Sequence, residues 1–283
     1  MYIWIYAIQL MAVDLNVVTD KVRGWAGWWI KKRMSKLEEE LTETMSVNPF
    51  LLPFLFEYHN LQTFDELVHL IVANHLMTGH NTGFGKLIDE KILPDVFGTI
   101  KLDRKFRNSH PPYDNSAFNE IDHLVMRPDG TAELISLKAG KWTIQLTMAV
   151  KLNESFVEIQ RYYGALIKHI VVGVFYGTEV ELTDKYDILR GINRGAKHNV
   201  IDVTDFVSVY TGKRFWEWLG GNVEGVQEAI LKGFIAAIAE MKIKLGNEKL
   251  LSDFKRKISA KYDNSAANNG VQDWIKLLNT INS

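Results

Sequence analysis

Apolar and polar positions follow two different periods along the chain, and the change of period divides it into helical and β-type segments. Apolar side chains at helical spacing predict helices in residues 17–45, 66–77, 87–97, 143–163, 223–244, 250–262 and 271–281. Shorter runs rich in β-branched and aromatic residues predict strands in residues 120–126, 131–138, 170–177, 200–203 and 206–210. The run at 170–177 is continuously apolar, which indicates a strand buried on both faces of a mixed sheet. We therefore expect an α/β fold, with a central mixed sheet flanked by helices and helical additions at both ends of the chain.

The predicted strand pair at residues 120–138 carries the side chains of greatest chemical interest. Asp122 and Lys138 lie near the ends of adjacent strands that a Pro-Asp-Gly turn connects. Because side chains on a strand alternate between faces, Lys138 shares its face with Ser136, and Glu133 belongs to the other face. Carboxylates can hold Mg²⁺, which activates water and neutralises phosphate charge, and a nearby lysine can position that water. The pattern indicates a metal-assisted phosphodiesterase with Ser136 where a second carboxylate would face the metal.

The helix that follows supplies two further carboxylates, Glu154 and Glu158, one turn apart. They belong to a polar stripe that also contains Lys151 and Arg161. In one interpretation the stripe is a solvated face with ion pairs between residues three positions apart. In the other, one of the two glutamates reaches the metal. The sequence leaves both interpretations open.

Composition narrows the class of protein. At 283 residues, with 47% apolar and 11% aromatic residues, the chain can build a large core and is too apolar for disorder. It has no cysteine, which excludes disulfides and thiolate metal sites and fits a cytoplasmic location. A net charge of −1 gives no global attraction to nucleic acid, so DNA contacts must come from local basic patches. The apolar residues 1–13 are too short for a membrane span and lack the basic start of a signal peptide, so no membrane contact is expected.

Two segments are candidates for DNA contact. The glycine-rich segment 78–86 lacks the spacing of a P-loop, but its backbone amides and Lys86 can hold a DNA phosphate; a tight loop between helices is the alternative. The segment 190–199 has three firm positive charges and no acid, and Arg and Asn are residue types that read guanine and adenine edges. A surface loop without a DNA partner is the alternative there. The candidate contacts in this second segment are Arg190, Asn193, Arg194, Lys197, His198 and Asn199.

Asp122 and Lys138, spaced across a hairpin that leads into a helix, resemble the pattern of the PD-(D/E)XK nuclease superfamily. The longer runs MSVNPFLLPF, HLMTGHNTGFGKLIDEKILP, SLKAGKWTIQLTMAVKLN and LTDKYDILRGINRGAKHNVID together resemble the type II restriction endonucleases that cleave the interrupted palindrome RGGNCCY. The resemblance covers most of the chain from about Val17 onward. The chain departs from the superfamily at Ser136, where Glu or Asp is expected. Some restriction enzymes with Ser at this place take the carboxylate from the next helix.

The resemblance implies a Mg²⁺-dependent endonuclease that cleaves double-stranded DNA as a homodimer, with a cognate DNA methyltransferase as its functional counterpart. It implies catalytic roles for Asp122 and Lys138, with Ser136 as a polar contact. Asp122 and Glu154 are the implied metal ligands, Glu158 is the alternative to Glu154, and Glu90 is implied as a first-helix acid near the metal.

The expected organisation has four parts. An accessory extension (1–13) precedes a helical dimerisation region (14–77), a nuclease core (78–222) and a C-terminal helical region (223–283). Two other functions remain open. One is a DNA-binding protein with a nuclease fold that lost its chemistry at Ser136, and the weaker one is a metal-dependent hydrolase of RNA or a small phosphoester.

Overall fold

The computed structural model describes residues 12–40, 48, 50–126, 130–140, 144–195, 197–241, 252–253, 255–257, 260 and 273–282. The chain divides into two compact units. The sheet unit comprises Met1–Trp25 and Gly85–Ile235, and the helical unit comprises Ala26–Phe84 and Ala236–Ser283. Most of the predicted extension 1–13, most of the turn before Gly130 and much of the predicted helix 250–262 lie outside the described residues. None of the described helices combines the length and the apolar character that a membrane span requires.

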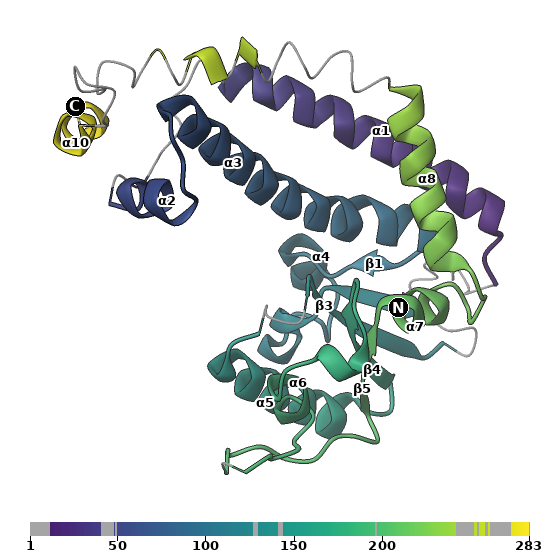
Figure 1. Ribbon diagram of the computed structural model, residues 1–283. Coiled ribbons are helices and arrows are strands. Elements are labelled where there is room, and N and C mark those ends of the chain that lie inside the picture. Colours follow the sequence, from purple (N-terminus) through teal and green to yellow (C-terminus); the bar gives the residue numbers. More distant parts are fainter. Residues whose placement is uncertain are drawn as a thin grey trace. The chain divides into compact units, whose positions relative to one another are not determined.

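A five-stranded mixed sheet forms the centre of the sheet unit (Figure 1). Its strands, in spatial and chain order, are β1 (Ile100–Lys101), β2 (His123–Met126), β3 (Ala132–Lys138), β4 (Ile167–Val174) and β5 (Val207–Thr211). β2 runs antiparallel to both β1 and β3, whereas β3, β4 and β5 run parallel. The prediction of a mixed α/β sheet is confirmed. β4 is an interior strand with an almost wholly buried second half, as the apolar run predicted.

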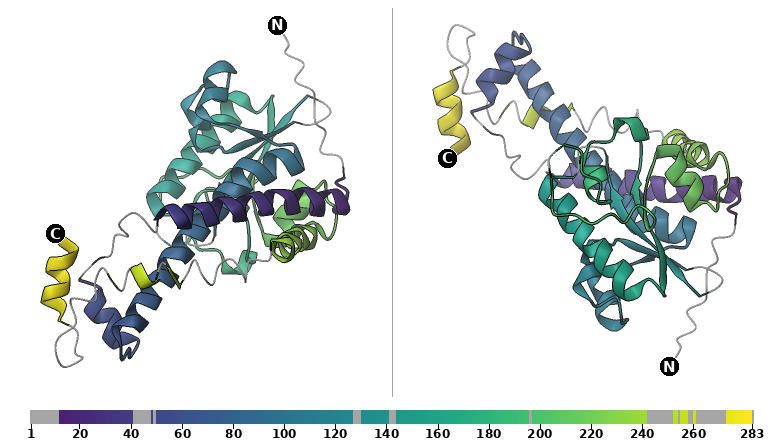
Figure 2. Two further views of the ribbon diagram at one scale, coloured as in Figure 1. Left: turned by 90° about the horizontal axis from the view of Figure 1, so that it is seen from above. Right: turned by 90° about the horizontal axis from the view of Figure 1, so that it is seen from below.

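Helices surround this sheet. Two views in Figure 2 show the strands side by side, with helices of the same unit against them. The main one, α5 (Leu146–Tyr163), connects the parallel strands β3 and β4, and its buried face shares a core with the sheet. Figure 1 shows α5 and α6 together on one side of the sheet. The remaining helical segments of the sheet unit are η1 (Ile88–Val96, a π-helix), α4 (Arg104–Ser109), η2 (Ser116–Glu120), η3 (Glu179–Glu181), α6 (Lys185–Ile188), α7 (Gly212–Leu219), most of α8 (Val226–Glu240) and the first part of α1 (Leu15–Glu40).

The two faces of β3 follow the predicted alternation. Ala132 and Leu134 belong to the core that α5 covers, whereas the buried Ile135 lies outside that core. On the opposite face of the neighbouring strand, Gly173 lies against the ring of Phe215 from α7. A Cβ atom at Gly173 would be 2.3 Å from that ring, so glycine is needed for α7 to pack this closely.

The predicted strand at residues 200–203 is wrong. The backbone of Ile201 bonds to the buried side chain of Asn153 in α5 instead of to a neighbouring strand. Its N–H donates to Oδ1 at 2.9 Å and its carbonyl oxygen accepts from Nδ2 at 2.8 Å. The buried side-chain amide of Asn153 therefore holds this segment in place without backbone hydrogen bonds to a neighbouring strand.

The helical unit contains the rest of α1, α2 (Leu52–Tyr58), most of α3 (Phe64–Leu87) and α10 (Trp274–Asn282). The predicted glycine-rich loop at 78–86 is wrong, because these residues continue α3. Gly79 lies against Arg33 and Gly83 against Trp29, so the glycines give two large side chains of α1 room to approach the α3 backbone. The helix begins with reciprocal hydrogen bonds between Thr63 and Glu66, so Thr63 is its N-cap.

We expect Gly173→Ala to lower the free energy of unfolding by about 1–3 kcal/mol, because the added methyl group displaces Phe215. Gly24→Ala is the matched control, since its Cβ would meet nothing within 4 Å in α1. There alanine should stabilise the protein by about 0.5–1 kcal/mol. Urea unfolding of both variants tests this, and equal effects of the two changes would contradict the packing of β4 against α7.

Candidate active site

The sheet topology brings Asp122 and Lys138 to one edge. β3, β4 and β5 are parallel, so their carboxyl ends share an edge, where ligands of open α/β sheets bind. β2 is antiparallel to β3 and therefore begins at this edge. Asp122 directly precedes β2 and Lys138 ends β3. Two residues that the sequence predicts to act together therefore lie at the same edge of the strand pair β2 and β3.

Asp122 lies directly before the first paired residue of β2. His123 pairs with Ile135, and the amide of Asp122 also donates to the carbonyl oxygen of Ile135, at 2.9 Å. The backbone of Asp122 is thus held against β3 at the end of the ladder. Asp122 Oδ2 then accepts a hydrogen bond from the backbone N–H of Leu137 at 2.6 Å. The carboxylate therefore lies beside the residue that separates Ser136 from Lys138.

The hydroxyl group of Ser136 is fully engaged. Its side chain is completely buried, and Oγ donates to the carbonyl oxygen of Glu120 at 2.9 Å. Lys138 Nζ donates to the same Oγ at 3.0 Å. Ser136 thus fixes the position of the lysine ammonium group and ties it to the backbone of Glu120.

Burial and charge act against each other on Asp122 and Lys138. Burial raises the pKa of Asp122, and the Lys138 charge and the Leu137 N–H offset part of this rise. Burial lowers the pKa of Lys138, opposed by the negative charges of Asp122 and Glu120. A lysine with a lowered pKa exchanges a proton nearer neutral pH than a solvated one.

Glu120 is a second carboxylate at this site, and the sequence analysis missed it. Its charge acts on Lys138, and its Oε1 accepts from Lys151 Nζ of α5 at 2.7 Å. Ile121 is extended (φ −101°, ψ 128°), buries its side chain and connects Glu120, the last residue of η2, to Asp122. The acid-x-acid spacing of Glu120 and Asp122 was the signal in the sequence.

A separate buried network lies next to Asp122. His123, which is completely buried, bonds to Asp89 Oδ1 through Nε2 at 2.8 Å and to Thr99 Oγ1 through Nδ1 at 2.9 Å. Lys101 forms an ion pair with the same carboxylate. Burial acts to raise the pKa of Asp89, but the bonds from His123 and Lys101 outweigh it and the pKa is lowered. The negative charge of Asp89 in turn raises the pKa of Asp122.

The first-helix acid closest to the site is therefore Asp89 and not the predicted Glu90. Both residues are in the first turn of η1, but Glu90 is exposed to solvent, whereas Asp89 is half-buried against His123. The prediction was one residue out along η1. The sequence signal for Asp89 was His123, a buried polar residue that needs a partner.

The structure does not bring Glu154 or Glu158 to Asp122 and Lys138. Both glutamates line a hollow on α5 together with Asn199 and Ile201. Within the described residues, the charges that shift the pKa values of Asp122 and Lys138 include neither glutamate. The predicted second metal ligand, Glu154, has no geometric support, and Lys151 pairs with Glu120 instead of with Glu154.

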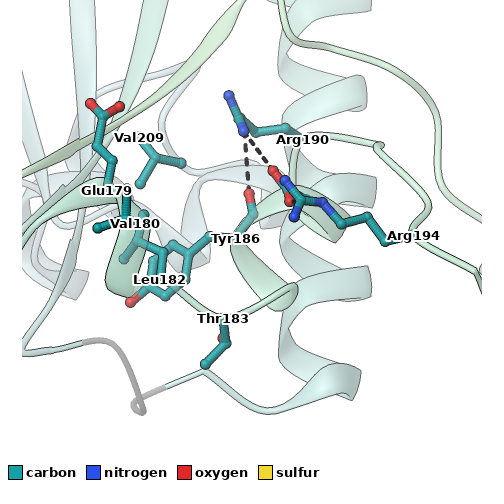
Figure 3. A pocket seen from close by; sticks show the side chains of 9 residues that line it. Glu179, Val180, Leu182, Thr183, Tyr186, Arg190, Arg194 and Val209 are labelled. Atoms are coloured by element: carbon teal, nitrogen blue, oxygen red, sulfur yellow. Dashed lines mark hydrogen bonds and ion pairs between the residues drawn. The ribbon is translucent and has the colours of Figure 1, made fainter.

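In the candidate DNA-reading loop, two arginines converge on one buried acid. Arg190 Nη2 lies 2.7 Å from Asp187 Oδ1, and Arg194 Nε lies 2.6 Å from Asp187 Oδ2. Figure 3 shows both arginines among the residues that line the adjacent pocket. Asp187 lies just outside the segment 190–199, so the absence of acids within that segment overstated its free positive charge.

The other candidate contacts differ in their surroundings. Asn193 Oδ1 accepts from the N–H of His198 at 2.8 Å, which shapes the loop. Lys197 and Asn199 are exposed. Lys86 is exposed in the last turn of α3, where the backbone amides belong to the helix and do not form the predicted phosphate-binding loop.

The donor set fits one class of metal. Among the residues that the structure describes, no group of three His, Cys, Asp or Glu side chains is placed to hold an ion, as Zn²⁺ would require. Mg²⁺ needs only one or two carboxylates, with water and substrate phosphate completing its coordination. Asp122 offers one such carboxylate, and Glu120, whose charge acts on the neighbouring Lys138, is the candidate for a second; neither side chain is fully buried.

We expect Asp122→Asn to stabilise the protein relative to wild type as the pH rises. The folded-state pKa of Asp122 is raised, so its carboxyl group favours folding only at low pH. That contribution is lost as the pH rises through the folded-state pKa. The difference in unfolding free energy should therefore grow as the pH rises above about 4, the pKa of an aspartate in the unfolded chain.

Urea unfolding at several pH values measures this difference. Asp184→Asn is the control, because the hydrogen bond from Lys185 lowers the pKa of Asp184 and its contribution has the opposite sign. A pH-independent difference for Asp122→Asn would contradict the burial of that carboxylate.

Comparison with known proteins adds no relative: no protein-family model and no curated protein matches the chain.

Proposed function

We propose that the chain is a Mg²⁺-dependent type II restriction endonuclease with a PD-(D/E)XK-type core, which hydrolyses phosphodiester bonds in double-stranded DNA. The observation that supports this most is the placement of Asp122 and Lys138 at one edge of the sheet. There the aspartate is bonded to the backbone next to the lysine, and each group shifts the pKa of the other. The hairpin leads into the helix α5, as the resemblance implies, and the parallel strand β4 follows.

Each residue has a defined part in this proposal. Asp122 and Glu120 would hold Mg²⁺, which when bound neutralises charge on the phosphate. Lys138, fixed by the buried hydroxyl of Ser136, orients the attacking water and balances the charge that develops on the phosphate. Burial lowers the pKa of Lys138, so it exchanges a proton more readily than a solvated lysine does. Glu120 thereby replaces the carboxylate that is missing at Ser136.

The proposed assembly is a two-fold homodimer, because a two-fold axis matches a palindromic site and places one catalytic edge on each strand. The proposed target is an interrupted palindrome such as RGGNCCY, and a cognate methyltransferase would protect the same sites in host DNA. Both rest on the sequence resemblance.

A second candidate function is sequence-specific DNA binding without cleavage. One observation favours it: Ser136 is buried with its hydroxyl group already bonded to Glu120 and Lys138, so it offers no ligand in place of the expected acid. In this case the edge would be a nuclease site without its full set of carboxylates.

We expect purified full-length protein with Mg²⁺ to cut phage DNA into discrete fragments. Asp122→Asn, Lys138→Met and Glu120→Gln should each slow cutting by about 10²–10⁴-fold, because each removes a charge that faces the phosphate. Glu154→Gln and Glu158→Gln should cut at the wild-type rate. Lys151→Gln should also remain active, which separates a ligand role of Glu120 from its ion pair with Lys151.

Two outcomes of this assay would change the proposal. Loss of activity in Glu154→Gln together with full activity in Glu120→Gln would return the second-ligand role to α5. Sequence-specific binding with no cleavage by wild type, in either Mg²⁺ or Mn²⁺, would support the second candidate function.

Lys197 is exposed, and among the described residues no ion pair involves it. If its loop follows the DNA backbone, Lys197→Gln should weaken binding to all sequences alike and reduce the salt slope of binding by about 1. Lys185→Gln is the control, because Lys185 is paired with Asp184. Fluorescence anisotropy at several salt concentrations measures both, and an unchanged slope for Lys197→Gln would remove this residue from the interface.

A further inference from the structure

The two arginines that meet Asp187 are held in different ways. Arg190 donates from Nη2 to Asp187 and from Nε to the carbonyl oxygen of Tyr186, and its side chain is 29% exposed. Arg194 uses Nε on the other oxygen of the same carboxylate, and its side chain is 70% exposed. Arg190 is therefore held against α6. Arg194 is anchored at Nε, and its two terminal nitrogens are the part that can extend toward a partner.

Asp187 is well placed to orient a reading side chain. Its side chain is 11% exposed, and both of its oxygens are engaged by guanidinium groups, so its charge is compensated although it is buried. Tyr186, the preceding residue, donates from its hydroxyl group to the carbonyl oxygen of Gly140 at 2.9 Å. Gly140 lies two positions after Lys138. The support beneath Arg194 is thus bonded to the segment that carries the catalytic lysine.

A planar guanidinium fork that is anchored at Nε matches the O6 and N7 acceptors of guanine in the major groove. A solvated lysine, or an arginine held at both edges, does not offer this geometry. We propose that Arg194, oriented by Asp187, reads a guanine base of the DNA target, and that Arg190 is a positioning residue that completes the support. This inference rests on the proposed function only in taking double-stranded DNA as the partner.

The test is selection of bound duplexes from a randomised DNA library by the full-length protein, with Ca²⁺ in place of Mg²⁺. Wild type should enrich guanine at one or more positions. Arg194→Lys keeps the charge but loses the fork, so it should bind DNA overall like wild type and lose about 10–100-fold of the preference for one of those guanines. Replacing that guanine by 7-deazaguanine should weaken wild type and leave Arg194→Lys unaffected.

Asp187→Asn should weaken the preference for the same guanine although Arg194 is still present. If Asp187 had a merely structural role, the loss would not be confined to that one base position. The melting temperature of Asp187→Asn shows whether this change also unfolds the loop. If it does, Arg194→Lys still tests the inference, because that variant leaves the buried Asp187 unchanged. Lys197→Gln is the matched control and should retain the guanine preference.

Several results would overturn the inference. Retention of the guanine preference by Arg194→Lys would do so, as would a uniform loss for all sequences in Arg194→Gln with a smaller salt slope, which indicates a phosphate contact. Enrichment of no sequence by wild type would also count against it. Absence of cleavage in Mg²⁺ with guanine selection intact would instead contradict the nuclease proposal alone.

Discussion

The hydrogen bond from the Leu137 backbone N–H to the carboxylate of Asp122 is the contact on which the candidate site depends. In a regular antiparallel pair, backbone groups would bond to each other here. At Asp122, just before β2 begins, a side chain takes the place of a backbone acceptor, so the carboxylate becomes part of the strand pair. Its position is then set by the sheet, which is more rigid than a loop. Lys138, one residue after Leu137, is placed relative to it by the same backbone.

This arrangement buries charge, and neighbouring charges reduce its cost. Desolvation raises the pKa of Asp122 and lowers that of Lys138, so isolation of either group would favour its neutral form. Together they stabilise each other, and Glu120 adds a second negative charge near the ammonium group. Across the strand, Asp89 is compensated separately by His123 and Lys101. The two networks affect each other through the repulsion between Asp89 and Asp122, so both belong to one electrostatic unit at the start of β2.

Sequence patterns predicted the parts of this structure that depend on local periodicity. The hairpin, the alternation along β3, the buried strand β4 and the pairing of Asp122 with Lys138 follow from period, turn residues and spacing. The helical conformation of the glycine-rich segment 78–86 was missed because its glycines make room for Trp29 and Arg33, which are distant in sequence. Glu120 was missed because it ends the helical segment η2, where a strand had been predicted, although it stands only two residues before Asp122. The ion pairs of Arg190 and Arg194 were missed because their partner, Asp187, lies before the segment.

Ser136 shows how the site can do without an acid on β3. The position is completely buried beside Asp122, and a carboxylate there would add a third negative charge to a site with one lysine. The smaller, uncharged serine donates its hydroxyl hydrogen to a backbone oxygen and accepts a hydrogen bond from the lysine. Glu120 instead supplies a carboxylate from a partly exposed position, where Lys151 compensates it. The edge thus keeps two acids and a lysine, with less buried charge than an acid at 136 would create.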